Sequence, residues 1–577
     1  MPPNLRLTHE RVDDVPLILG FLIRLQLPQL LDKHLKPHPH HRGLSPGWLI
    51  ALWITYILSR ADHRKSHVRD WAAKLHHCLQ AVTGWTIRDV DLTDDRLTLL
   101  LARLSRNETW DRIEADLWRG TCEVYSLPLE RIRLDSTTSY GFHAPVEGGL
   151  MQLGHSKDHR PDRAQFKLMA AAAEPTGQLI ATTVHPGDAA DDPLYLPIID
   201  RVRALLGKTG LLYAGDCKMA ALETRGTIAA RGDFYLTPLP LTGATKEDFT
   251  ATWIEDAVGG DRRAELVPIR VGDDPIGVAY EFDRQQTADI DQETRTWKER
   301  VQVIRSDSLA ESQARALQRR LEGAEAAVRA LTPPVGPGRV QFATGWELER
   351  AVAAVLAEQE VGDLLEVAWT REEASRTRYV GRGRGGPKRL KKTELKIRYQ
   401  ITAVRRKGEA IKDREARLGW RVQVTNVPRE RMSLVESVLA YRGGWAVERD
   451  FHLLKDRPLG VRPLYVRRDD QVVGLAHLVT LALRVLTLLE VLVRRGQAES
   501  GKKLAGLYAG QASRTTDRPT GPRVLEAIAR EGVTATEVDD GEQRRWHLGP
   551  LPELVSGVLS SLGLTEEIYN RILFKPN

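Results

Sequence analysis

The chain has 577 residues, too many for one hydrophobic core, and at roughly 150 residues per domain it predicts about two to four domains. A hydrophobic share of 42% with mixed charges is typical of a soluble globular protein, and the net charge of +7 favours a polyanionic partner. The cysteines Cys78, Cys122 and Cys217 are far apart and form no C-x-x-C pair, which excludes a disulfide framework and a thiolate zinc site.

The first residues carry no apolar core of a signal peptide, so we expect a cytoplasmic protein. The longest apolar run, residues 474–493, contains His477, Arg484 and Glu490. Charged side chains are costly at the centre of a bilayer. We therefore predict a buried helix of a soluble domain and no association with a membrane.

Residues 1–125 are expected to form a helical N-terminal domain that binds DNA. The segment "SPGWLIALWITYILSRA" places Ser45 at a capping position and Pro46 in the first helical turn, and the basic run "DHRKSHVRDW" follows it. The alternative is that the basic side chains of this run only form a solvated helix face: His63, Lys65, His67 and Arg69.

Residues 126–241 change to the pattern of a sheet. The segments "ERIRLDSTTSYGFH", "AQFKLMAAAAEP" and "GQLIATTVHP" predict three strands, and "GLLYAGD" and "DFYLTPL" predict two more, each preceded by a helix. Three strands in a meander, with a helical crossover to a fourth strand beside the first, form a mixed sheet covered by helices. The predicted fold class is therefore α/β, an α+β arrangement with a mixed sheet.

Residues 242–425 interrupt this pattern with strand-like pieces and two helices. A long helix is predicted from Ser308, with Glu311 completing a capping box, to about Leu331. A second helix is predicted over about 346–358. We expect a mixed α/β domain here.

The stretch 376–399 of this domain holds ten Lys and Arg residues and one acidic residue. A flexible basic loop of this kind suits a phosphate backbone, because glycine lets the chain approach and each neutralised phosphate releases counterions. Tyr379 and Tyr399 add the aromatic groups typical of nucleic-acid binding. The alternative is a disordered charged linker. The expected DNA contacts are Arg382, Arg384, Lys388, Arg389, Lys391 and Lys392.

Two aspartates end predicted strands, Asp135 in "RIRLDST" and Asp216 in "LLYAGDC". If the fourth strand lies beside the first, both carboxylates fall at one place on the sheet, and Glu448 is expected to join them from a helix packed over it. Three carboxylates without thiolates favour Mg²⁺ or Mn²⁺. Two such ions about 4 Å apart stabilise both oxygens of a phosphodiester displacement, which indicates nuclease or strand-transfer chemistry.

The stretch "YRGGWAVERDFHLLK", residues 441–455, carries Tyr441, Glu448 and Lys455 at intervals of seven. On one continuous helix these three side chains lie on nearly one stripe. A Glu and a Lys on one helix face are, in isolation, typical of a solvated pair. Trp445 is interpreted as a core residue or as a stacking partner for a base near the cleaved end.

Other aspartates compete with these as metal ligands. Asp188, Asp191 and Asp192 lie in "HPGDAADDP", which has the composition of a turn and a helix start, so we expect them to cap backbone N–H groups. A basic, Pro-containing hairpin carries Asp158 and Asp162. We expect this hairpin to touch DNA through Lys157, Arg160 and Arg163.

Four motifs together carry a family resemblance: "LDSTTSYG", "GHSKDHRPDRAQFKL", "YAGDCKMA" and "YRGGWAVERDFHLLKDRPLGVRPLYVRRDDQVVG". In this order, over about 130–490, they resemble the DDE transposases of bacterial insertion sequences, specifically the branch with a Tyr-x2-Arg-x3-Glu-x6-Lys signature. The resemblance implies a ribonuclease-H-like catalytic core formed by 126–241 and 426–495. It also implies that 242–425 is an insertion domain, and it leaves 496–577 as a C-terminal region without an assigned role.

Carried over position by position, the resemblance makes Asp135, Asp216 and Glu448 the metal-binding triad. It makes Tyr441 and Lys455 contacts to phosphates of the transposon end. One position departs from the signature, because the family Arg falls at Gly444. Arg442 lies about 160° away on an ideal helix, so it replaces that Arg only if Gly443 and Gly444 deform the helix.

The resemblance implies a transposase that cuts DNA at the ends of an insertion sequence and joins the freed 3′-hydroxyl to target DNA. It implies two Mg²⁺ or Mn²⁺ ions, a homodimer on double-stranded DNA, and a bacterial cytoplasmic protein associated with the nucleoid. A nuclease of the same fold without strand transfer is an alternative. A second alternative is a transposase-derived DNA-binding protein with an inactive site.

Overall fold

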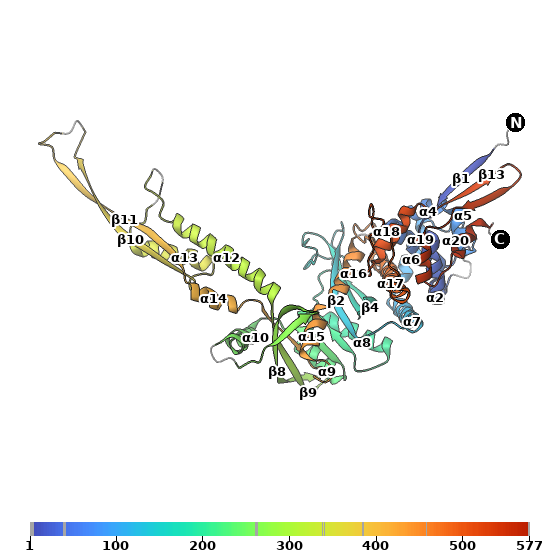
Figure 1. The fold of residues 1–577 in the computed structure, drawn as a ribbon, viewed down its shortest axis with the longest axis horizontal. Coiled ribbons are helices and arrows are strands. Elements are labelled where there is room, and N and C mark those ends of the chain that lie inside the picture. Colours follow the sequence, from blue (N-terminus) through green and yellow to red (C-terminus); the bar gives the residue numbers. More distant parts are fainter. Residues whose placement is uncertain are drawn as a thin grey trace. The chain divides into compact units, whose positions relative to one another are not determined.

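The computed structural model describes residues 5–574 except 38–41, 260–262, 337–338, 340, 383–385 and 457. The chain forms two compact units (Figure 1). The first consists of Met1–Thr237, Gln286–Trp297 and Leu439–Asn577, and the second of Pro238–Gln285 and Lys298–Val438.

The N-terminal part of the first unit is mostly helical, as predicted. Its helices are α1 (Val15–Arg24), α2 (Leu27–His34), α3 (Pro46–Arg60), α4 (Lys65–Ala73), α5 (His76–Thr83), α6 (Asp94–Leu104) and α7 (Asn107–Tyr125). Ser45 is the N-cap residue of α3 and Pro46 lies in its first turn, as predicted, but the Ser45 hydroxyl donates to the Asp32 carboxylate and not to a backbone group of the helix. A strand that the sequence analysis missed, β1 (Arg6–Arg11), precedes these helices and pairs antiparallel with β13 (Thr534–Asp539).

A mixed sheet forms the centre of the first unit. Its strands are β2 (Arg131–Tyr140), β3 (Gln165–Glu174), β4 (Gln178–Pro186), β5 (Leu212–Ala214) and β6 (Phe234–Pro238), in the order β4-β3-β2-β5-β6. The strands β2, β3 and β4 run antiparallel, whereas β2, β5 and β6 run parallel. The predicted meander with a crossover to the position beside the first strand is confirmed. The crossover elements are η1 (Asp192–Leu194), α8 (Tyr195–Leu206), η2 (Cys217–Ala220) and α9 (Leu222–Ala230).

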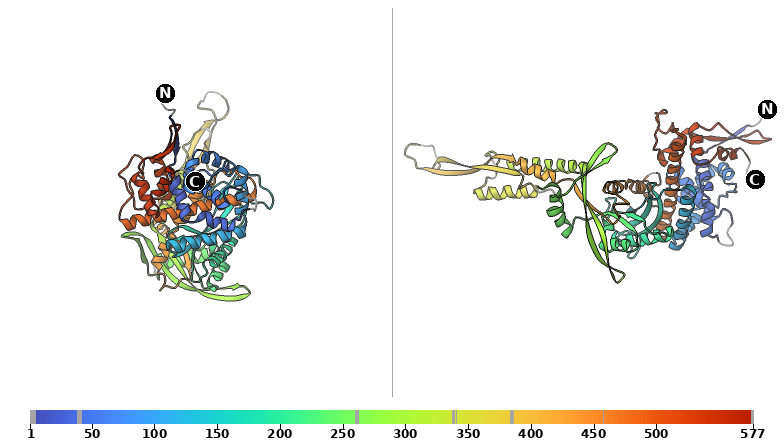
Figure 2. Two further views of the ribbon diagram at one scale, coloured as in Figure 1. Left: turned by 90° about the vertical axis from the view of Figure 1, so that its right-hand side faces the viewer. Right: turned by 60° about the horizontal axis from the view of Figure 1, so that its bottom comes forward.

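The C-terminal part of the first unit covers this sheet with helices. Helix α16 (Trp445–Lys455) packs against β2 and against α17 (Asp469–Ser500), and α17 packs against α3 and α6 (Figure 2). The remaining elements are α18 (Gly521–Glu531), β13 and β14 (Arg544–Leu548), α19 (Glu553–Ser561), α20 (Glu567–Asn570) and η4 (Arg571–Leu573).

Helix α17 is long and apolar enough to cross a membrane, but 94% of its apolar window is buried inside the protein. The predicted buried helix is therefore confirmed. Its polar residues have partners: Arg484 pairs with Glu114, and the His477 ring bonds the Leu104 carbonyl at 2.8 Å. Burial lowers the pKa of His477 to about 3, so this imidazole is neutral.

The second unit contains a run of four neighbouring strands and a long hairpin. The four strands have the order β12-β9-β8-β7, and the hairpin pairs β10 with β11 antiparallel. The elements in chain order are α10 (Gly243–Asp248), η3 (Phe249–Trp253), α11 (Ile254–Val258), β7 (Val267–Val271), β8 (Asp274–Ile290), β9 (Glu293–Ser306), α12 (Asp307–Ala330), α13 (Gly345–Glu358), β10 (Leu365–Tyr379), β11 (Lys391–Arg406), α14 (Gly408–Ala416), β12 (Trp420–Thr425) and α15 (Leu434–Arg442).

Two expectations for this unit are corrected. The capping box at Ser308 and Glu311 is wrong, because α12 begins at Asp307 and has no side-chain cap. A capping box forms instead on α13, between Thr344 and Glu347. The basic stretch is also not one loop, because most of it belongs to the two long strands of the hairpin.

Candidate active site

The strand register brings Asp135 and Asp216 together. In the parallel pair of β2 and β5, Arg133 lies opposite Ala214, and each aspartate follows its paired residue by two positions. Successive side chains alternate between the two faces of a sheet, so the two carboxylates share one face at the same end of neighbouring strands. The charge of Asp216 accordingly contributes to raising the pKa of Asp135.

Asp135 is a desolvated carboxylate with a cation beside it. Burial is the main cause that raises the pKa of Asp135, and Lys157 opposes this rise. The Lys157 ammonium lies 3.0 Å from Asp135 Oδ1 and donates to the Ser136 carbonyl at 2.6 Å. The expected contact of Lys157 is DNA, but in this structure its ammonium belongs to the carboxylate centre.

Asp216 is held at the start of η2. Its Oδ1 accepts hydrogen bonds from the Lys218 backbone N–H at 2.9 Å and from the Tyr195 hydroxyl at 2.6 Å. The Asp216 carbonyl accepts from the Thr237 hydroxyl at 2.7 Å. Burial, together with the charge of Asp216, raises the pKa of Tyr195, so this phenol stays protonated and keeps donating.

Asp191 is a further carboxylate near this centre. The expectation that it caps a helix start is wrong: η1 has no side-chain cap, and Asp191 Oδ1 accepts from Lys167 at 2.5 Å and from the Ser136 hydroxyl at 3.2 Å. Although burial opposes the change, Lys167 lowers the pKa of Asp191 below its usual range. The sequence signal for this pair is Lys167, a cation in the mostly apolar strand β3, which needs an acidic partner.

The predicted single helix over residues 441–455 is wrong. Helix α15 ends at Arg442, residues 443 and 444 form a turn, and α16 begins at Trp445. Tyr441 therefore lies on a different helix from Glu448 and Lys455, and the three do not form one regular stripe.

An arginine of β2 fills the space beside this turn. Arg133 is buried, and its Nε donates to Glu174 at 2.9 Å while Nη2 donates to the Ala440 carbonyl at 2.9 Å. Its guanidinium also lies 5.5 Å from the centre of the Tyr441 ring. A Cβ atom at Gly444 would lie 2.9 Å from Arg133 Cζ. Arg133 thus supplies a guanidinium next to the position where the family signature has its arginine.

Glu448 is exposed on α16, between two points where this helix touches the sheet region. At one end Gly444 adjoins Arg133, and at the other Lys455 Nζ donates to Asp158 at 2.6 Å. Arg442, at the end of α15, is exposed. Among the described residues, no three acidic, histidine or cysteine side chains are close enough to hold a metal ion. Asp135 and Asp216 alone offer two carboxylate oxygens of the kind that bind Mg²⁺. Glu448 does not form a three-ligand group with them in this structure.

The basic turn between β2 and β3 connects these parts. Asp158, which follows Lys157, is buried and binds Lys455 and Arg462, the latter at 3.2 Å. Arg160 is paired with Asp162 at 2.8 Å and lies over the Tyr140 ring. The charges of this turn are thus largely neutralised within the protein.

Comparisons with known proteins identify the family of this chain. The family model described as "Transposase DDE domain" matches residues 128–485. This chain belongs to the transposase DDE domain family. A search of curated proteins finds no match. A cryo-EM structure of the piggyBac transposase synaptic complex with hairpin DNA is similar over 48% of this chain and 60% of that chain, with 10% identity and a TM-score of 0.23.

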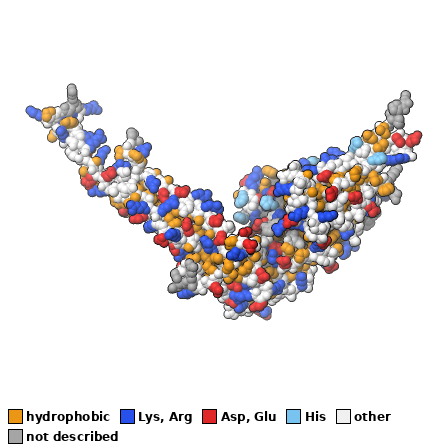
Figure 3. Space-filling view, in the orientation of Figure 1, with side chains coloured by type: hydrophobic (Ala, Val, Ile, Leu, Met, Phe, Trp, Pro, Cys, Tyr) orange, Lys and Arg blue, Asp and Glu red, His pale blue; other side chains and the backbone are white. Residues whose placement is uncertain are grey.

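The hairpin of the second unit in this DDE-family chain has a basic surface. Lys and Arg side chains gather along β10 and β11 (Figure 3). Glu394 pairs with Arg378 at 2.7 Å and with Lys392 at 3.6 Å, and Lys391 lies over the Tyr379 ring. Of the expected DNA contacts, Arg382, Lys388, Lys391 and Lys392 are exposed, whereas Arg389 is half-buried and donates to the Val380 carbonyl at 3.1 Å. Arg384 lies outside the described residues.

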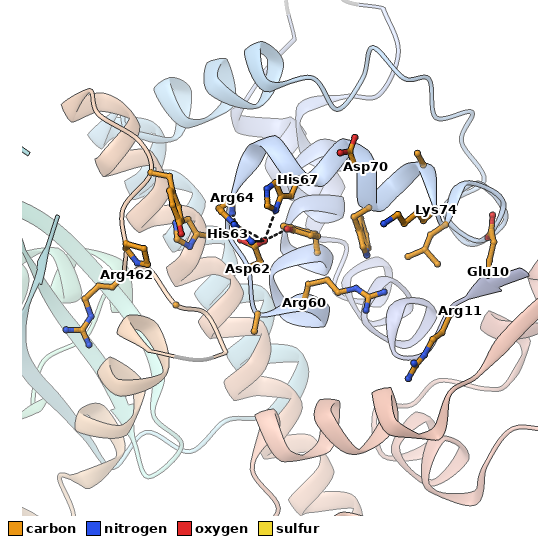
Figure 4. A pocket seen from close by; sticks show the side chains of 18 of the residues that line it. Glu10, Arg11, Arg60, Asp62, His63, Arg64, His67, Asp70, Lys74 and Arg462 are labelled. Atoms are coloured by element: carbon orange, nitrogen blue, oxygen red, sulfur yellow. Dashed lines mark hydrogen bonds and ion pairs between the residues drawn. The ribbon is translucent and has the colours of Figure 1, made fainter. Parts of the chain in front are cut away.

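A groove of about 1340 Å³ lies in the first unit, between the N-terminal helices and the segment after α16 (Figure 4). Its basic and histidine side chains include Arg11, Arg60, Arg64, Lys74, Arg462, His63 and His67. The Asp62 carboxylate in the groove binds Arg64 at 2.9 Å and His67 at 3.3 Å. His63 is buried rather than part of a solvated face, and Lys65 pairs with Asp94 at 2.5 Å.

Proposed function

We propose that this protein is a DNA transposase of a bacterial insertion sequence, which cuts DNA at the ends of the element and joins the freed 3′-hydroxyl to target DNA. The observation that supports it is the placement of Asp135 and Asp216 on one face, at the same end of neighbouring parallel strands, within the region that the family model matches. Glu448, on the helix packed against β2, completes the proposed triad.

Asp135, Asp216 and Glu448 are the proposed ligands of two Mg²⁺ or Mn²⁺ ions. Bound there, these ions would stabilise the attacking and leaving oxygens of an in-line phosphoryl transfer. The carboxylates hold cations and do not attack the substrate themselves. Tyr441 and Lys455 are the proposed contacts to phosphates beside the cleaved bond, where they orient the reacting group.

DNA is proposed to bind three surfaces besides this centre. The first is the turn of Lys157 and Arg160, in which Lys157 adjoins Asp135. The second is the hairpin with its exposed cations, and the third is the N-terminal groove with Arg60 and Lys74. Double-stranded DNA requires such neutralising contacts over several phosphates. Because two ends of an element are cut together, we propose a homodimer on DNA. We also propose that the chain acts in the bacterial cytoplasm at the nucleoid.

The domain assignment is part of this proposal. Residues 1–125 are the N-terminal DNA-binding domain, 126–241 and 426–495 the catalytic core, and 242–425 the insertion domain. Residues 496–577 form a C-terminal region. A truncation that removes the hairpin loop alone, rather than a core element, is expected to leave metal binding intact.

The test uses purified full-length protein and DNA that carries the inverted repeats flanking the coding region, together with a target plasmid. We expect cleavage and strand transfer with Mg²⁺ or Mn²⁺, and neither in EDTA. Asp135→Ala, Asp216→Ala and Glu448→Ala are expected to lose both activities but to keep binding DNA. Full activity of Asp216→Ala would exclude the triad. Cleavage without joining would identify a nuclease, and binding without cleavage under all metal conditions would identify an inactive DNA-binding protein.

The groove is tested separately. Arg60→Ala with Lys74→Ala is expected to weaken DNA binding, because both side chains line the groove. Arg69→Ala is the matched control, since Arg69 lies on the same helix as several groove residues but is not among those lining it. Equal effects of the two changes would show that general surface charge, and not the groove, holds DNA.

A further inference from the structure

The turn Ser156–Asp158 presents two opposite charges to two parts of the proposed active site. The Lys157 ammonium lies 3.0 Å from Asp135 Oδ1, where the proposed function puts a metal ion. The next residue, Asp158, lies 2.6 Å from Lys455, which the proposed function puts on a phosphate. A cation therefore faces the metal-binding carboxylate, and an anion faces the phosphate-binding cation.

Burial and backbone hydrogen bonds hold this turn in place. The Asp158 side chain is 4% exposed and also pairs with Arg462 at 3.2 Å, and Lys455 itself is 12% exposed. The backbone holds the turn, because the Lys157 N–H donates to the Thr138 hydroxyl at 3.0 Å and the Ser156 hydroxyl accepts from the Asp158 and Arg160 N–H groups. The Asp158 pairs are therefore not the loose ion pairs of a solvated surface. The Lys157 and Asp135 side chains are 27% and 25% exposed, and the turn holds Lys157 in place.

Each of the two sites holds buried charges that need a partner of opposite charge. Asp135 is desolvated and adjoins a second carboxylate, so the charged pair requires a cation. Lys455 and Arg462 converge on one place and require an anion there. In a complex, the metal ion and a DNA phosphate would meet these two needs.

We propose that Lys157 and Asp158 are the resting counter-ions of the catalytic centre, and that the metal ion and the DNA phosphate displace them together. This inference rests on the proposed function. Because the two residues are adjacent in one turn, displacement of Lys157 from Asp135 loosens the hold of Asp158 on Lys455, and the reverse. Metal binding and DNA binding therefore favour each other, and the coupling is reciprocal. Each ligand alone accordingly binds more weakly than it does in the presence of the other.

The first test measures Mn²⁺ binding to the DNA-free full-length protein by electron paramagnetic resonance. Removal of the competing ammonium in Lys157→Met is expected to tighten Mn²⁺ binding about tenfold or more, in line with the effect of one close charge on a carboxylate. Lys218→Met is the matched control: Lys218 is a nearby cation that faces Asp192 at 3.7 Å and not Asp135. Lys157→Arg keeps the charge and is expected to bind Mn²⁺ as weakly as the wild type.

A merely structural role of Lys157 gives the opposite sign, because a displaced Asp135 binds metal less well. Mn²⁺ affinity of Lys157→Met that is lower than wild type, or no higher than that of Lys218→Met, would overturn the inference. If Lys157→Met does not fold, as judged by circular dichroism, the DNA binding of Asp158→Asn tests the inference instead.

The second test measures DNA binding in EDTA. Asp158→Asn keeps the shape of the side chain but frees Lys455 and Arg462 for phosphate, so we expect tighter metal-free DNA binding and a smaller gain on adding Mn²⁺. Asp162→Asn is the control, since Asp162 lies in the same turn but pairs with Arg160. Unchanged or weaker DNA binding of Asp158→Asn contradicts the inference. Absence of cleavage by the wild-type protein with Mg²⁺ or Mn²⁺ would instead contradict the proposed function, so the two failures are distinguishable.

Discussion

Gly444→Ala tests whether the turn before α16 is shaped by Arg133. A Cβ atom at 444 would lie 2.9 Å from Arg133 Cζ and 3.2 Å from its Nε and Nη1. The guanidinium cannot simply move aside, because Glu174 and the Ala440 carbonyl hold it at 2.9 Å each. Gly444 has φ −65° and ψ 0°, which alanine adopts without strain. Any destabilisation therefore arises from the contact and not from the backbone.

The expected magnitude is a balance of two effects. Displacement of Arg133 weakens hydrogen bonds that involve charged groups, which are worth about 1.5–3 kcal/mol each. Replacement of a glycine by alanine next to a helix stabilises the folded state by at most about 1 kcal/mol. We expect Gly444→Ala to lower the free energy of unfolding by about 1–2 kcal/mol. At Gly443 the nearest atom to an added Cβ is 3.5 Å away, so Gly443→Ala is expected to be neutral or slightly stabilising.

The assay is urea unfolding of both variants and the wild type, followed by cleavage of end-containing DNA. The same contact predicts that Gly444→Arg, which restores the residue of the family signature, damages folding and cleavage rather than improving them. Equal stability of Gly443→Ala and Gly444→Ala would refute the role assigned to Arg133. Raised activity of Gly444→Arg would show that position 444 can accommodate the arginine of the family signature.

Three further predictions concern phosphate contacts and pH. Lys455→Ala should lower the cleavage rate more than the DNA affinity, because few residues orient the reacting phosphate whereas many hold the duplex; equal losses would contradict this. A hairpin variant with four charges removed should show a flatter salt dependence of DNA binding and unchanged Mn²⁺ binding. Its substitutions are Lys388→Ala, Arg389→Ala, Lys391→Ala and Lys392→Ala. An unchanged slope of log affinity against log salt would contradict the hairpin's role. Burial raises the pKa of Asp450 on α16 to about 7, so the folded state holds a proton that the unfolded chain releases near pH 4. Stability should therefore fall as pH rises from about 4 to about 7, by on the order of 4 kcal/mol. Asp450→Asn should remove this fall in thermal unfolding curves, and a persisting fall would place its origin in another group.

The sheet of the core was predictable because its signals are local. Alternation in β2 and the apolar run of β3 identify strands, and a helical crossover restricts where the next parallel strand can lie. The approach of Asp135 to Asp216 follows from that order, since both residues end their strands. The register that places Arg133 opposite Ala214 confirms this expectation.

Features fixed by distant residues were not predictable in the same way. Two adjacent glycines permit either a regular helix or a turn, and the turn at 443–444 is occupied by an arginine from β2, about three hundred positions earlier in the chain. Strand β1 pairs with β13 from the other end of the sequence. The stretch 376–399 resembles a loop in composition, but cross-strand pairing over fifteen positions of β10 makes most of it a hairpin.

Charge counted along the sequence also overstates the charge available to DNA. Lys157 and Lys455 are two of the basic residues expected to meet DNA, yet each is paired with an aspartate inside the first unit, at 3.0 and 2.6 Å. Such paired cations release no counterions until their aspartates are displaced, so they add little to the salt dependence of the first encounter. The hairpin cations are more exposed, and the pair of Lys392 with Glu394, at 3.6 Å, lies at the surface, where such pairs are weak. Initial, sequence-independent DNA binding should therefore depend mainly on the hairpin, whereas the paired lysines contribute only once metal and the cleavable phosphate are both in place.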